Sequence, residues 1–137
     1  MAESLIVDAN PLLSALLGGT AASIATSAGF ELYSTQHTLF EVEKYLPRLA
    51  RKLDKPELDL FRAFQRLPVI ACQPAVYDAE LSKAEKLIGD RDLKDAPLLA
   101  LVLTLQFPIW TEDRDFDGIA GIEVIRTADL VARIGAD

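Results

Sequence analysis

Short apolar segments alternate with longer segments of helical periodicity along this chain, and the alternation restricts the fold more than any other feature. The expected strands cover residues 5–7, 30–34, 68–72, 108–110 and 122–125. Each one is followed by a stretch long enough to hold a helix. Helical crossovers connect parallel strands and place helices on both faces of the sheet. We therefore expect a three-layer α/β/α sandwich with a central parallel sheet of about five strands.

The 137 residues suit a single domain over residues 1–137, and no internal repeat or low-complexity tract divides the chain. The first residues carry no basic leader, and the longest apolar stretch, residues 96–107, is too short to span a bilayer. The lone Cys72 can form no internal disulfide. These features predict a cytoplasmic protein without a membrane segment.

Local signals set the expected helix boundaries. Pro11 suits the first turn of a helix, for which Asn10 is a natural cap. Thr38 is expected to open a second helix, and Pro47 inside that helical pattern predicts a kink or a break into two helices. Residues 92–106 are predicted to form one strongly apolar helix before the fourth strand.

Acidic residues gather where such a sheet would place a ligand site. Asp8 ends the first expected strand, and Asp113 follows the fourth, with Asp115 behind it. In open α/β sheets, ligands bind outside the carboxyl ends of the strands. Asp95 lies in the first turn of the helix before the fourth strand, and it reaches this edge only if the chain bends suitably.

Convergent carboxylates repel one another and raise each other's pKa unless a cation lies among them. Oxygen ligands suit Mg²⁺ or Mn²⁺, whereas the single histidine and single cysteine argue against a zinc site. The alternatives are ordinary ones. Asp8 or Asn10 would cap the first helix and Asp92 or Asp95 the later one, and the acids after residue 112 would form a solvated turn.

Four motifs, in order, resemble those of the PIN domain family. Residues 5–14 resemble its opening, an apolar strand followed by Asp-x-Asn and a helix. Residues 38–42 resemble its second motif, in which a glutamate follows a hydroxyl residue, and residues 92–97 resemble the third. Residues 108–116 are similar to the fourth, an apolar strand closed by Thr-x-Asp-x-Asp-Phe. The resemblance spans residues 4–126.

This resemblance implies a PIN-like fold and an endoribonuclease that uses Mg²⁺ or Mn²⁺ to hydrolyse RNA phosphodiester bonds. It assigns catalysis and metal binding to four residues, Asp8, Glu41, Asp95 and Asp113, with Asp115 as a further ligand. It gives supporting roles to Asn10, Thr111 and Asp92. Helix geometry leaves Glu43 as a rival to Glu41, because the two lie on opposite sides of the apolar stripe; only the spacing from Thr38 favours Glu41.

The net charge of −7 argues against a nucleic-acid binder unless bound cations and local basic residues offset it. Two divalent ions would bring the charge to about −3. Candidate RNA-binding residues are Arg48, Arg51, Lys52 and Arg114. Their alternative role is that of a solvated surface.

The resemblance also implies a VapC-type toxin of a type II toxin–antitoxin pair, with RNA as substrate and a cognate antitoxin as partner. The apolar residues of the second half exceed what a small monomer needs to bury, which predicts a homodimer or a covered groove. Two alternatives stay open. One is a PIN-like nuclease of RNA processing outside such a pair, and the other is a non-catalytic PIN-like binding module.

Overall fold

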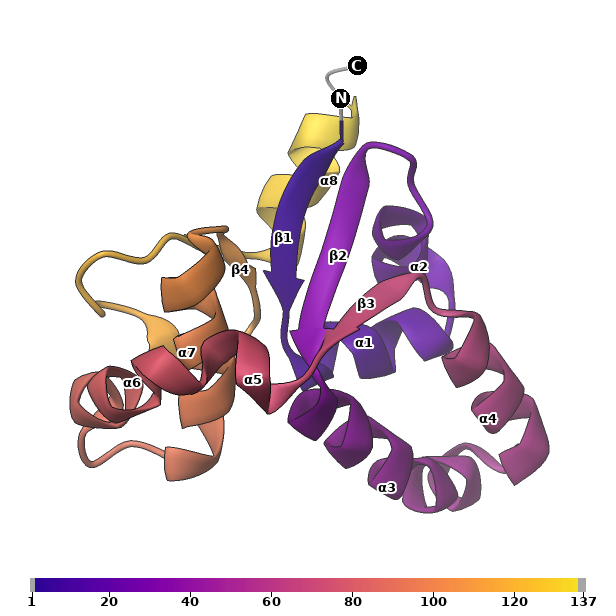
Figure 1. The fold of residues 1–137 in the computed structure, drawn as a ribbon. Coiled ribbons are helices and arrows are strands. Elements are labelled where there is room, and N and C mark those ends of the chain that lie inside the picture. Colours follow the sequence, from indigo (N-terminus) through magenta and orange to yellow (C-terminus); the bar gives the residue numbers. More distant parts are fainter. Residues whose placement is uncertain (1, 136–137) are drawn as a thin grey trace.

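The computed structural model describes residues 2–135, which form a five-stranded parallel sheet with helices on both faces. The strands are β1 (Glu3–Val7), β2 (Phe30–Thr35), β3 (Val69–Cys72), β4 (Ile109–Trp110) and β5 (Val124–Ile125). They lie in the order β3-β2-β1-β4-β5, so the first strand is central (Figure 1). The predicted three-layer α/β/α architecture is confirmed, and every expected strand overlaps an observed one.

The pleat of the central strand divides the apolar side chains between two cores. Leu5 and Val7 of β1 point into one core, and Ile6 between them points into the other. The first core is covered by α1 (Ala9–Leu16), α2 (Gly19–Ala25), α3 (Gln36–Leu53), α4 (Glu57–Arg66) and α8 (Thr127–Gly135). The second is covered by α5 (Pro74–Tyr77), α6 (Leu81–Ile88) and α7 (Ala96–Leu105), which group on one side of the sheet in Figure 1.

The first helix begins earlier than expected. It starts at Ala9, directly after β1, and its cap is Asp8, whose Oδ1 accepts a hydrogen bond from the Ala9 N–H at 2.7 Å. The expectation that Asn10 is the cap is therefore wrong. Asn10 already lies in the first turn, and its Oδ1 accepts from the Glu112 N–H at 3.2 Å, which ties α1 to the loop after β4.

Helix α3 starts at Gln36, two residues before the expected Thr38, and it is continuous, so of the kink or break expected at Pro47 the break is wrong. The Thr35 hydroxyl caps its start by accepting from the Thr38 N–H at 2.9 Å. Val42 and Leu46 before the proline, and Leu49 after it, are all buried against the same core. Packing on both sides of Pro47 offsets the backbone hydrogen bond that the proline cannot donate.

The apolar helix predicted over residues 92–106 is shorter and is preceded by a tighter turn. Residues Leu93–Asp95 form a 3₁₀ turn, η2, and α7 then runs from Ala96 to Leu105. Asp92 caps η2, because its Oδ1 accepts from the Lys94 N–H at 3.0 Å. None of the helices in the described residues is long and apolar enough to cross a membrane.

Candidate metal centre

The candidate site lies at the carboxyl edge of the sheet, between β1 and β4. These two strands flank the point where the chain changes direction across the sheet, from β1-β2-β3 on one side to β4-β5 on the other. Such a switch point leaves a crevice at the strand ends. Asp8 follows β1 and Thr111 follows β4, and the Asp8 N–H donates to the Trp110 carbonyl at 3.1 Å.

A buried threonine connects the two strand ends. The Thr111 hydroxyl donates to Asp8 Oδ2 at 2.7 Å and accepts from the Asp113 N–H at 2.9 Å. Asp113 Oδ1 then accepts from the Asp115 N–H at 2.9 Å within the 3₁₀ turn η3 (Arg114–Phe116). Side-chain and backbone bonds thus hold Asp8, Asp113 and Asp115 in one connected network.

Three carboxylates approach one another closely. One oxygen each from Asp95, Asp113 and Asp115 lies within 4.8 Å of the other two, and all three residues are half-buried. Turn η2 brings Asp95 to this edge, which was the condition for its membership of the site. Asp113 could be predicted from its position just after a strand end, whereas Asp95 reaches the same edge only through turn η2.

Asp95 is the most perturbed of these acids. Burial, followed by repulsion from Asp8 and Asp113, raises the pKa of the Asp95 carboxyl to about 7. Its Oδ2 is buried without a hydrogen-bond partner, and its side chain does not cap α7. Burial likewise raises the pKa of Asp8, although the bonds from Thr111 and Ala9 oppose that change. The capping alternative therefore fails for Asp95 but holds, in addition to its place in the network, for Asp8.

A cleft of about 180 Å³ opens beside these acids. It is lined by Asp8, Ala9, His37, Thr38, Glu41, Asp92, Lys94 and Asp95. Glu41 therefore faces the cleft from α3, whereas its rival Glu43 lines a separate groove between α3 and α4. Asp113 is not among the lining residues, and it joins the site through Asp95 and Thr111.

Residues behind the acids orient the loop that carries them. The Arg126 guanidinium donates to the Thr111 carbonyl at 2.7 Å, to the Asp113 carbonyl at 3.3 Å, and to both carboxylate oxygens of Asp117 at 2.7 Å. The sequence interpretation missed Arg126. Its position directly after β5, at the ligand-binding edge, is a signal that could have found it.

The predicted basic residues lie outside the cleft. Arg48, Arg51, Lys52 and Arg114 are all exposed, and none of them lines it. The basic side chains that do line it are Lys94 and His37, which were not predicted as site residues. His37 lies one helical turn before Glu41, so the i, i+4 spacing could have indicated that both face the same side.

The donor set fits a hard divalent cation such as Mg²⁺ or Mn²⁺. All the convergent ligands are carboxylate oxygens, and Asp95 Oδ2 lacks any other partner. Oxygens on opposite sides of one Mg²⁺ lie about 4 Å apart, so a spread of up to 4.8 Å needs only small side-chain rotations. Bound positive charge would also relieve the repulsion that raises the pKa of Asp95.

Several solved structures share the fold of this chain. The structure of PAE2754 from Pyrobaculum aerophilum has a TM-score of 0.73 at 19% identity, covering 100% of this chain and 92% of that one. A toxin-antitoxin complex from Klebsiella pneumoniae gives 0.62 at 22% identity, covering 86% and 94%. VapBC2 from Rickettsia felis, bound to a promoter DNA fragment, gives 0.61 at 10% identity, covering 90% and 98%.

These likenesses show the shared fold, and no curated protein matches the sequence. The family model described as PIN domain matches residues 6–133, which is nearly the whole chain. The chain therefore belongs to the PIN domain family.

Proposed function

We propose that the protein is an endoribonuclease that uses Mg²⁺ or Mn²⁺ to hydrolyse RNA phosphodiester bonds. Two observations on the same residues carry the proposal: carboxylate oxygens of Asp95, Asp113 and Asp115 approach one another closely, and Asp95 Oδ2 is buried without a hydrogen-bond partner. Membership of the PIN domain family supports the same reading, because the family is generally one of nucleases. Carboxylates that lie close together without a compensating partner destabilise a fold. Their presence here therefore favours a functional role, the binding of a cation.

We assign metal binding to Asp8, Glu41, Asp95 and Asp113, with Asp115 as a further ligand. The bound ion would lower the pKa of a water molecule and offset negative charge on the scissile phosphate. Thr111 holds the Asp8 carboxylate in place, and Asn10 fixes the loop after β4 against α1. Asp92 supports Asp95 by capping the turn that carries it.

We assign Glu41 a second role, that of proton acceptor. It is exposed and lines the cleft that Asp95 also lines, and from there its carboxylate can accept the proton of an attacking water. In hydrolysis that water's oxygen bonds to phosphorus, the bond from phosphorus to the leaving ribose oxygen breaks, and the leaving oxygen takes a proton from solvent water. Lys94 lines the same cleft and supplies positive charge for a phosphate, and His37 beside it offers a hydrogen-bonding side chain.

The matched pair Glu41 and Glu43 gives the sharpest test. Purified protein should cleave RNA with Mg²⁺ or Mn²⁺ and not with EDTA. Glu41→Gln and Asp8→Asn should lower the rate by a factor of 100 or more, while Glu43→Gln should keep the wild-type rate. Circular dichroism and thermal melts check that each variant is folded. Full activity in folded Asp8→Asn, or cleavage that persists in EDTA, would contradict the proposal.

We further propose that the protein acts as the toxin of a type II pair, in the cytoplasm, as a homodimer with a cognate antitoxin. The support is the similarity to a toxin-antitoxin complex and to VapBC2, which are relatives in fold. Expression of the wild-type protein should arrest growth, and expression of Asp8→Asn should not. RNA cleavage in vitro without growth arrest would favour a nuclease of RNA processing. Absence of both would favour a non-catalytic binding module.

A further inference from the structure

The solvent-facing side of α3 carries a stripe of basic and aromatic residues. His37, Phe40, Lys44, Arg48 and Arg51 recur every three or four residues. They therefore share one helix face, which is opposite the buried Val42, Leu46 and Leu49. We call this set the α3 stripe. From His37 to Arg51 it extends about 21 Å along the helix.

Phe40 is unusual for an aromatic residue of a small protein, because 58% of its surface is exposed. The Lys44 Nζ lies 5.5 Å from the centre of the Phe40 ring, and the Arg48 guanidinium lies 5.7 Å from the ring of Tyr45. Of these two rings only Phe40 belongs to the α3 stripe, and an exposed aromatic ring beside a cation is a feature of surfaces that bind single-stranded nucleic acid. An exposed ring with a cation beside it provides a platform for a base and a contact for its phosphate.

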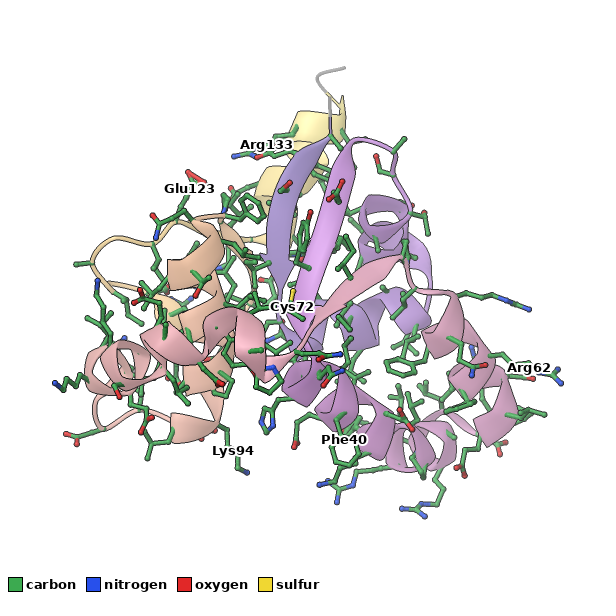
Figure 2. The ribbon with its side chains drawn as sticks, viewed as in Figure 1. Phe40, Arg62, Cys72, Lys94, Glu123 and Arg133 are labelled. Atoms are coloured by element: carbon green, nitrogen blue, oxygen red, sulfur yellow. The ribbon has the colours of Figure 1, made fainter. Side chains whose placement is uncertain are left out.

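The stripe is continuous with the candidate metal centre. His37 lines the cleft from the first turn of α3, and Phe40 follows within one turn. In Figure 2, Phe40 projects from α3 and Lys94 projects from the turn before α7, both toward the same lower edge of the molecule. A strand of nucleic acid lying in the cleft would therefore reach Phe40 as it leaves.

We propose that the α3 stripe binds the single-stranded RNA that flanks the cleavage site, with one base stacked on Phe40 and the adjacent phosphates held by Lys44 and Arg48. The inference rests on the proposed nuclease function, which places the scissile phosphate in the cleft. Charge complementarity selects this occupant, because Lys44, Arg48 and Arg51 outnumber Glu41, the acid on the same face, in a chain of net charge −7. Stacking on Phe40 requires a base with a free face, which a paired and stacked duplex does not offer.

Binding is measured separately from cleavage. The probe is a fluorescein-labelled 15-nucleotide RNA of unpaired sequence, titrated by anisotropy against cleavage-deficient Asp113→Asn protein in Mg²⁺. The same RNA annealed into a blunt duplex is the second probe. Phe40→Ala should weaken binding of the single strand about five-fold or more, and Phe40→Trp should restore it. Neither change should alter duplex binding. Leu58→Ala, which removes another exposed apolar side chain, is the matched control.

Lys44 gives a second readout. Lys44→Gln should reduce the slope of log affinity against log salt by about 0.7 for the single strand. The control Lys83→Gln changes an exposed lysine of α6 and should leave that slope unchanged. The proposal would be overturned if Phe40→Ala lost equal affinity for the single strand and the duplex, or if neither Phe40→Ala nor Lys44→Gln lost affinity. The stripe would then contact a protein partner or solvent. Wild-type protein that binds RNA through Phe40 but never cleaves it would overturn the nuclease function alone.

Discussion

Thr111 shows how an uncharged side chain can organise charged ones at the edge of the sheet. Its hydroxyl donates to Asp8 and accepts from the backbone of Asp113, so it holds the acids after β1 and β4 in register. Because Thr111 is fully buried, removing its hydroxyl leaves Asp8 Oδ2 and the Asp113 N–H without this partner at an interior position. The threonine is therefore a positioning residue, and its contribution should be visible in both folding and cleavage.

We predict that Thr111→Val lowers the free energy of unfolding by about 1–3 kcal/mol, because the buried Asp8 carboxylate and the half-buried Asp113 N–H lose their partner. Cleavage should fall at least ten-fold, since Asp8 is no longer held toward β4. Chemical denaturation and single-turnover cleavage measure the two effects. The control is Thr104→Val, which removes a threonine hydroxyl that bonds only the helix backbone at Ala100. Equal effects of the two substitutions on cleavage would refute the positioning role.

The raised pKa of Asp95 predicts how the stability of the metal-free protein changes with pH. Its folded-state pKa is raised from 3.8 to about 7, so between these values the folded protein retains a proton that the unfolded chain has lost. Stability from this residue is fully present below about pH 4 and is lost as the pH rises toward 7. In EDTA the melting temperature should therefore fall across this range relative to Asp95→Asn, which cannot ionise.

Two controls separate this effect from general titration. Asp59→Asn removes an exposed acid of α4 and should keep the wild-type pH dependence. Mg²⁺ added at pH 7.5 should raise the melting temperature of wild-type protein more than that of Asp95→Asn, because the ion binds the folded carboxylates. If wild type and Asp95→Asn have parallel pH profiles in EDTA, the buried position of Asp95 does not govern stability.

At the scale of elements, the short β4–η3 connection carries Thr111 and Asp113, and Arg126, directly after β5, restrains it. One guanidinium bonds two carbonyls of this connection and the carboxylate of Asp117. We predict that Arg126→Lys costs about 1–2 kcal/mol, because a lysine cannot make these bonds together. The exposed ion pair of Arg133 with Glu3 is the control, and Arg133→Lys should cost less than about 1 kcal/mol.

The substitution Arg126→Lys should affect RNA cleavage more than RNA binding. Arg126 touches no cleft residue, so Arg126→Lys should keep RNA affinity while the cleavage rate falls, because the Asp113 backbone is less restrained. Anisotropy and single-turnover assays separate the two quantities. A variant that loses affinity and rate together would show that Arg126 acts through general destabilisation.

Element-level reasoning explains which parts of the site could be predicted from sequence. Asp8 and Asp113 could be predicted because the apolar segments of the sequence show where the strands end, and the carboxyl ends of parallel strands meet at one edge of the sheet. Asp95 depended on a 3₁₀ turn that periodicity does not show. The choice of Glu41 over Glu43 at the cleft depends on the rotation of α3 against the sheet, which is a tertiary property. Arg126 was not predicted, because its hydrogen-bond partners lie in other segments of the chain.

At the scale of the whole molecule, the distribution of charge matters more than its sum. The chain has 21 acidic and 14 basic residues, yet five of the basic ones fall within residues 44–55, where Asp54 is the lone acid. The acids that meet at the cleft would be neutralised in part by the bound cation. An acidic protein can therefore present a local basic surface beside an acidic cleft, and long-range repulsion is screened at physiological salt.

Charge reversal at two places tests this distribution directly. The double variants Arg48→Glu/Arg51→Glu on α3 and Lys83→Glu/Lys86→Glu on α6 change the net charge by the same amount, so they differ only in position. We predict that the α3 pair lowers affinity for a 15-nucleotide RNA at least ten-fold and reduces the salt slope by about 1.4. The α6 pair should change affinity less than two-fold. Neither pair should slow cleavage of a dinucleotide, which is too short to reach Arg48. Equal losses in the two variants would mean that net charge, and not the basic face of α3, controls RNA binding.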